Sequence, residues 1–258
     1  MFIDVISSKT ANRLSRLLRK RWFQAALLCL MVVVVGGVLY VRHEISALPD
    51  WWKPADGTSS ETIAVGESTE NQVLSEMNRV QGRRDGSEWA LELGEEEINA
   101  WLAARMPRWA ANQFPGSFLA KGVTQAHVRL EEGGVIRLGA LVDFDMRGGG
   151  GGVAVGEDQR VQGISVVLVP KIDEADGRLR LVISGARIGR LPVPTGSVIG
   201  LVIDHFDVPN RELRDLLEGR AVEAEVKRGK NRRMVLESVV VEQGRMVLGW
   251  KTELGNGG

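Results

Sequence analysis

Cysteine and histidine are scarce in this sequence of 258 residues. The single cysteine, Cys29, excludes an intrachain disulfide and a metal site built on cysteines. The three histidines, His43, His127 and His205, are too far apart in the sequence to indicate a zinc site. An excess of charge of either sign is also missing, because 33 basic residues balance 33 acidic ones. This balance excludes a strongly basic nucleic-acid binder and a highly charged disordered chain.

One long hydrophobic run lies near the N-terminus. Residues 22–41 carry no charge, and a helix of that length at about 1.5 Å per residue spans roughly 30 Å, the thickness of a bilayer core. Six basic residues precede the run within residues 1–21 and few follow it. This asymmetry predicts an anchor in the bacterial inner (cell) membrane, with a cytoplasmic basic tail and a periplasmic or extracellular C-terminal part. The alternative is a cleaved signal peptide, whose apolar region is shorter and ends in small residues.

The exported part divides into a linker and a domain. Residues 42–86 contain prolines and a stretch rich in Ser, Thr and Glu, which predicts a linker or stalk. A short helix is expected within it, with Thr69 and Gln72 at the spacing of a capping box. Residues beyond 42 comprise 26 basic and 32 acidic side chains, a formal charge of about −6. We therefore expect no electrostatic attachment of this part to nucleic acid or to an anionic membrane surface.

Residues 87–258 alternate between strand and helix patterns. Trp89–Leu93 predicts a short strand, and an amphipathic helix follows from Glu95. Strand-like alternation then recurs, with Gly133-Gly134 as a hairpin turn. Expected strands are 122–131, 135–146, 161–171, 178–188, 220–228, 233–242 and 245–252, and expected helices are 196–206 and 210–219. The pattern predicts an α+β domain with one curved antiparallel sheet of about six or seven strands and helices packed on one face.

The two middle strands, 161–171 and 178–188, are apolar on both sides. A half-buried antiparallel strand should keep one polar face. We therefore expect both faces of the middle of the sheet to be covered, by helices, by lipid or by a partner.

Candidate catalytic groups all have a plainer interpretation. Glu95–Glu97 suits the first turn of a helix, where the macrodipole favours acids. Asp204, His205 and Asp207 form the most metal-like cluster, but 205 lies on a different helix face from the other two. The serine in 196–200 follows the first glycine directly, which excludes a nucleophile elbow. The sequence predicts no catalytic residue, no cofactor and no metal, hence a protein that is not an enzyme.

Large apolar side chains are the remaining signal. They are concentrated in the helix after Glu95 and in the helix 196–206, which is apolar almost all round. A plain hydrophobic core explains them, and so does a groove for an acyl or isoprenoid chain. The candidate groove residues are Ile98, Trp101, Leu102, Met106, Trp109, Val198, Leu201 and Val202.

Two short segments, Glu95–Leu102 and Gly185–Pro194, resemble the YpmS-like family of single-pass bacterial membrane proteins. The resemblance implies a cytoplasmic tail, one membrane span, a helix with an acidic start and an Asn-Ala-x-Leu element, and a long antiparallel sheet. It implies no established reaction. The pentaglycine segment 148–152 and the long stalk depart from the family pattern. In outline the family is similar to the tubular lipid-binding architecture, a half-barrel, which favours a lipid ligand by analogy.

Together these observations predict a non-catalytic, membrane-anchored envelope protein that binds a lipid or a lipid-linked molecule in an apolar groove. The alternative is a scaffold subunit whose apolar face docks on another protein of an envelope complex. An enclosed groove would favour the first hypothesis, and a flat exposed apolar patch would favour the second.

Overall fold

The computed structural model describes residues 21–79, 86–115, 120, 122–143, 161–173, 177–206, 211–227 and 232–254. The chain divides into two compact units, Met1–Glu44 and Ile45–Gly258. The first contains most of helix α2 (Arg21–Ser46). Within α2, Ala26–Ser46 is long and apolar enough to cross a membrane, so the predicted apolar helix is present.

The second unit contains a four-stranded antiparallel sheet whose strands come from the two ends of the domain. β1 (Glu88–Gly94) pairs with β10 (Arg245–Leu254), which pairs with β9 (Arg232–Glu242) and then β8 (Glu225–Lys227). Helix α3 (Ser60–Arg79) covers this sheet, as Val73 and Met77 pack against buried Trp89 and Met234. The strand at 89–93 therefore finds its partner more than 150 residues later in the chain, at Arg245–Lys251.

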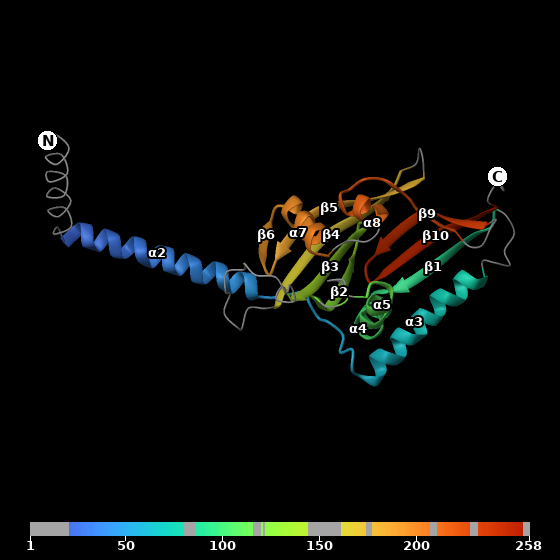
Figure 1. Ribbon diagram of the computed structural model, residues 1–258, viewed down its shortest axis with the longest axis horizontal. Helices are drawn as coiled ribbons and strands as arrows, with labels where there is room; N and C mark the ends of the chain where they lie inside the picture. Colours follow the sequence, from blue (N-terminus) through green and yellow to red (C-terminus); the bar gives the residue numbers. More distant parts are fainter. Residues whose placement is uncertain are drawn as a thin grey trace. The chain divides into compact units, whose positions relative to one another are not determined.

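A larger sheet contains six antiparallel strands in sequence order. They are β2 (Val123–Glu131), β3 (Val135–Asp143), β4 (Val161–Ile172), β5 (Arg178–Ile188) and β6 (Leu191–Val193), with β7 (Val222–Glu223) pairing beside β5. The predicted hairpin turn at Gly133-Gly134 is confirmed, because both residues have positive φ angles near 80°. Figure 1 shows the smaller sheet (β1, β10, β9) beside this larger one.

The apolar face of the larger sheet is covered by helices and by the other sheet. α4 (Glu95–Ala104) places Ile98 and Leu102 against Val128 and Leu130, and β9 adds Val241. Farther along, α7 (Thr195–Phe206) inserts Val198 among Val142, Ile164 and Ala186. Two further short helices are α5 (Met106–Gln113) after α4 and α8 (Arg211–Leu217) after α7. The α+β class with antiparallel strands is thus confirmed.

The structure corrects the expectation of one continuous curved sheet, because the strands form two sheets. The reason lies at the outer edge of β2. Side chains of α4 and the turn between β9 and β10 bond to this edge, so that no further strand among the described residues pairs there.

The apolar character of both faces of β5 has a local cause. The register of β4 and β5 shifts between Val167 and Leu168, where Ser184 of β5 is the extra residue. A bulge of this kind reverses which side chains of β5 face the core, so β5 shows apolar residues on both sides over its length. β4 has no extra residue, and its Val167 and Val169 stay on the face opposite Val166 and Leu168.

The structure of the segment expected to form a stalk also differs from that expectation. Ile45–Arg79 belongs to the same compact unit as the sheets, and α3 is longer than the short helix expected from Thr69. Ser59 is the cap, since its Oγ accepts a hydrogen bond from the Thr62 N–H at 3.1 Å. Thr69 lies inside the helix, where it is buried and donates its hydroxyl proton to the Val65 carbonyl.

Helix α3 and the residues just before it approach α4 closely at two glycines. A Cβ atom on Gly66 would lie 2.9 Å from the Ala100 carbonyl oxygen, and one on Gly57, just before the helix, would lie 2.5 Å from that of Ala103. Glycine at these positions lets the two segments approach at backbone distance. α3 is thereby attached to the domain along α4 and along β1.

Candidate functional site

The face of the larger sheet opposite its helices is covered by a strap, defined here as residues 48–53. Trp52 is buried, and its ring occupies the space beside Gly139 of β3, where a Cβ would lie 2.2 Å from Trp52 Cζ3. His127 of β2 is the strand partner of Gly139. Because Gly139 has no side chain, it leaves room for the Trp52 ring on this face of the sheet, where the adjacent strands carry side chains.

Arg190, in the turn after β5, holds the other part of the strap. Its Nη2 donates to Asp50 Oδ1 at 2.6 Å, and its Nε donates to the Leu48 carbonyl at 3.2 Å. These groups are exposed to solvent, so we expect them to orient the strap more than to stabilise the fold.

The edge of β2 is bonded by side chains of α4. The Asn99 amide donates to the Val128 carbonyl and accepts from the Val128 N–H, both at 2.8 Å. One helical turn earlier, Glu95 Oε2 accepts from the Leu130 N–H at 2.7 Å. Gly244, in the turn between β9 and β10, donates to the Leu130 carbonyl at 3.2 Å. The acidic start and the Asn-Ala-x-Leu element therefore have a structural role at a strand edge.

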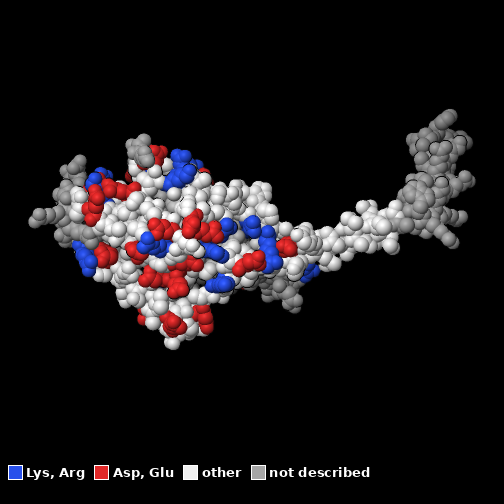
Figure 2. All heavy atoms as spheres, turned by 180° about the vertical axis from the view of Figure 1, so that it is seen from behind, with Lys and Arg blue, Asp and Glu red and all other residues white. Residues whose placement is uncertain are grey.

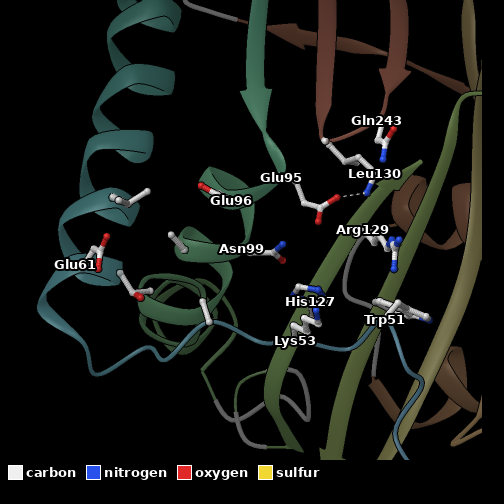
Figure 3. A pocket seen from close by; sticks show the side chains of 15 residues that line it. Trp51, Lys53, Glu61, Glu95, Glu96, Asn99, His127, Arg129, Leu130 and Gln243 are labelled. Atoms are coloured by element: carbon white, nitrogen blue, oxygen red, sulfur yellow. Dashed lines mark hydrogen bonds between the residues drawn. The ribbon is translucent and has the colours of Figure 1, made fainter. Parts of the chain in front are cut away.

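A cavity of about 560 Å³ lies between α3, α4, the strap and β2 (Figure 3). In Figure 3, Glu61 and Glu96 come from the two helices, while Trp51, Lys53 and His127 lie toward the sheet. This volume is within the usual range of small-molecule sites, about 300–1,000 Å³. Its lining residues are Trp51, Lys53, Ala55, Glu61, Thr62, Val65, Glu95, Glu96, Asn99, Ala100, His127, Arg129, Leu130, Gln243 and Gly244.

His127 is a buried polar residue of this cavity. It is 5% exposed, and the Trp51 ring stacks on it at a centroid distance of 5.7 Å. Its Nδ1 atom is buried and has no hydrogen-bond partner among the described residues. Burial lowers the pKa of His127 below its ordinary value of 6.5; the Glu95 carboxylate acts to raise it, and Arg129 acts to lower it. The ring is therefore neutral at pH 7, with one nitrogen that donates and one that accepts.

The charges around the cavity are mixed. Lys53 and Arg129 line it together with Glu61, Glu95 and Glu96. The face of the domain visible in Figure 2 is similar, with acidic and basic side chains interspersed. Neither the cavity nor this face provides a field of one sign that would attract a polyanion.

A second cavity, of about 290 Å³, shares Trp51 with the first. It lies over β4, β5 and β6 on the strap side of the sheet, and its polar lining includes Ser165, Ser184, Arg137 and Arg187. Arg137 is paired with Glu131 at 2.7 Å. Trp51 therefore stands between two hollows on the polar face.

Of the eight residues predicted to form one apolar groove, the structure describes the side chains of six, and these lie in different clusters. Ile98 and Leu102 pack in the core beside Val128, and Val198 is 1% exposed in a separate core cluster. Trp101 is half-buried and lies 6.1 Å from the ring of Trp109, which is 43% exposed. Met106 is half-buried at the start of α5. The side chains of Leu201 and Val202 lie outside the described residues, and none of the other six lines the cavities above.

Among the candidate catalytic and metal-binding groups of the sequence, the structure describes the acidic run that begins α4. Glu97 Oε2 accepts from the Gly94 N–H at 2.7 Å, which confirms that the acidic run caps a helix. Asp207, the pentaglycine segment 148–152 and the side chains of Asp204 and His205 lie outside the described residues. Within the described part of the chain, no group of three or more His, Cys, Asp or Glu side chains could hold a metal ion.

Sequence reasoning missed Trp51, His127 and Asn99 as neighbours. One signal was present, since a glycine inside a strand marks a close approach of other atoms, and Gly139 is such a residue. The partner, Trp52, is 87 positions away and carries no pattern that points to it. No protein-family model matches the chain, and no curated protein is significantly similar to it in sequence.

Proposed function

We propose that this chain is a membrane-anchored, non-catalytic binding protein that holds the polar end of a lipid or lipid-linked molecule in the cavity beside His127. The observation that carries this proposal is the buried, unpartnered Nδ1 atom of His127 in a cavity of about 560 Å³. An unsatisfied buried polar atom costs about 1–3 kcal/mol. A ligand group that bonds to it recovers this free energy.

The position of the cavity along the chain supports a ligand at the membrane. Trp51 follows Ser46, the end of α2, by five residues, and such a stretch reaches at most about 18 Å. If α2 spans the bilayer with its basic flank in the cytoplasm, this short connection limits how far Trp51 can lie from the outer leaflet. An acyl chain could then stay in the bilayer while its polar end enters the cavity.

The proposed binding site is a cavity lined by both apolar and polar groups, in place of the predicted apolar groove. Among the described residues of the predicted groove, Ile98, Leu102 and Val198 belong to core clusters, and Trp101 belongs to a partly exposed aromatic group around Trp109. The cavity wall instead combines the Trp51 ring with charged and amide groups. Such a lining suits a polar head better than a hydrocarbon tail.

The scaffold alternative receives less support from the described surface. In Ile45–Gly258 the exposed large apolar side chains are spread over several elements, and a docking face would gather them. They are Leu48, Ile63, Leu74, Trp109, Val182 and Val240.

The test is native mass spectrometry of the full chain released from lipid nanodiscs. We expect a stoichiometric lipid on the wild type and a marked loss of it in Gln243→Ala, whose exposed side chain lines the cavity. Trp101→Glu is the comparison variant, because Trp101 belongs to the predicted apolar groove and does not line the cavity. Wild-type protein released without lipid would contradict binding and favour the scaffold. Loss of lipid in Trp101→Glu alone would contradict the cavity as its site.

A further inference from the structure

The polar groups of the cavity are of opposite kinds and are interspersed. Lys53 can only donate hydrogen bonds, whereas Glu61 and Glu96 can only accept them at neutral pH. Gln243 and neutral His127 can do both. For Lys53, Glu61, Glu96 and Gln243 the described part of the structure contains no hydrogen bond or ion pair. These groups are therefore available to a ligand.

Three other lining side chains, those of Asn99, Glu95 and Arg129, already have partners. The Asn99 amide is hydrogen-bonded to the backbone of Val128, and the Glu95 carboxylate accepts a hydrogen bond from the Leu130 N–H. Arg129 lies 3.6 Å from Glu131 in an ion pair. The available set is thus one ammonium, two carboxylates, one amide and one buried imidazole nitrogen.

This set disfavours a simple ion. An anionic head would meet the carboxylates of Glu61 and Glu96, and a cationic head would meet Lys53 and Arg129. A neutral group with several hydroxyls avoids both conflicts, because each hydroxyl donates one hydrogen bond and accepts others. It can donate to a carboxylate and accept from the ammonium at the same time.

The Trp51 side chain, which forms one wall of the cavity, narrows the chemical class of the ligand further. Its indole, stacked on His127, presents an apolar surface among polar groups. A pyranose ring has an apolar face of C–H groups and a rim of hydroxyls, so it fits an aromatic wall surrounded by donors and acceptors. A flexible polyol without a ring has no such flat face.

We infer that the cavity binds a neutral saccharide. The inference rests on the proposed function and makes the sugar the polar end of the lipid-linked molecule. A free sugar has the same hydroxyl chemistry, and the experiment separates the two sources.

The experiment uses the full chain in phosphatidylcholine nanodiscs, because maltoside and glucoside detergents would themselves supply sugar heads. The nanodiscs carry glucosyl-diacylglycerol, the same diacylglycerol without sugar, or phosphatidylglycerol. Retention of each lipid is measured by native mass spectrometry, and soluble maltose is titrated in parallel as a competitor. We expect the glucosyl lipid to be retained preferentially. Lys53→Ala and Gln243→Ala should each weaken its binding by roughly five- to tenfold, the effect of one lost hydrogen bond.

Trp109→Ala, on an exposed aromatic residue outside the cavity, is the control that should leave binding unchanged. Competition by maltose at concentrations similar to those of the glycolipid would support saccharide recognition and assign a free sugar as its source. Equal retention of glucosyl and sugar-free lipid would overturn the inference but leave the proposed function standing. Retention of no lipid, together with no effect of maltose, would overturn both.

Discussion

Asn99 and Val128 form a closed pair of hydrogen bonds, in which one side-chain amide satisfies both the N–H and the carbonyl of a strand residue at 2.8 Å. The amide thus takes the place of a neighbouring strand at the edge of β2. It fixes α4 against the larger sheet and forms one wall of the cavity.

Replacement of Asn99 by alanine should therefore destabilise the domain. Two buried backbone groups lose their partner at once, so we expect the free energy of unfolding to fall by about 2–4 kcal/mol. Urea denaturation of the full chain in detergent, followed by circular dichroism, measures this loss. Asn112→Ala, on the exposed side of α5, is the matched control and should change stability little. Equal stability of the two variants would show that the edge does not depend on Asn99.

A side chain at Gly139 should displace the strap. Gly139→Val would place a Cβ 2.2 Å from the Trp52 ring, a distance that only movement of the ring can relieve. We expect faster protease cleavage within residues 48–53 and a red-shifted tryptophan emission. Gly185→Ala is the control on the same sheet, because its Cβ would meet Val167 at an ordinary 3.7 Å. Unchanged proteolysis of Gly139→Val would contradict the packing of Trp52 on β3.

The crossing of α3 and α4 should be equally sensitive to size. Gly66→Ala would bring a Cβ to 2.9 Å from the Ala100 carbonyl oxygen, which forces the helices apart. We expect a loss of about 1–3 kcal/mol, typical of overpacking, in the same denaturation assay. Gly200→Ala, on α7, has no atom within 4 Å of its new Cβ. There the greater helix propensity of alanine should raise stability by about 0.5–1 kcal/mol. A stabilising effect at both positions would contradict the close crossing.

Acid should weaken the domain through His127. Burial holds the pKa of this residue below 6.5 in the folded state, although the Glu95 carboxylate acts in the opposite direction. As the pH falls below about 6.5, the unfolded chain takes up the proton first, so the free energy of unfolding declines until the folded-state pKa is reached. His127→Phe removes this proton. Its stability should therefore fall less than that of the wild type between pH 7 and pH 5. Parallel pH profiles for the two proteins would contradict a buried neutral imidazole.

Local patterns predicted most of the elements. The uncharged run at 22–41 lies within α2, and the alternation at 135–146 contains β3, which the structure describes as Val135–Asp143. The helix from Glu95 begins where its acids suit the macrodipole. In each case a single side-chain period or composition over a few turns decides the structure, and neighbouring residues alone supply it. The start of α3 was misplaced because Thr69 and Gln72 imitate a cap, while the serine that does cap, Ser59, precedes a mostly polar turn.

The candidate site could not be predicted in the same way. No local pattern links Trp51 and Trp52 to a strand, yet they pack on Gly139 and His127 of the larger sheet. The apolar residues of α4 and α7 read as one groove, yet they belong to different core clusters. A period shows that a residue is buried, but it does not show which distant residue buries it.

The sequence by itself thus determined the apolar N-terminal helix, the α+β class and the position of most strands, since these depend on residues close together in the chain. Only the tertiary structure decided the division into two sheets, the pairing of β1 with β10 and the cavity between strap, helices and β2. Those features depend on contacts between residues from 29 to more than 150 positions apart. Such contacts form when the whole chain closes on itself, and no local pattern records them.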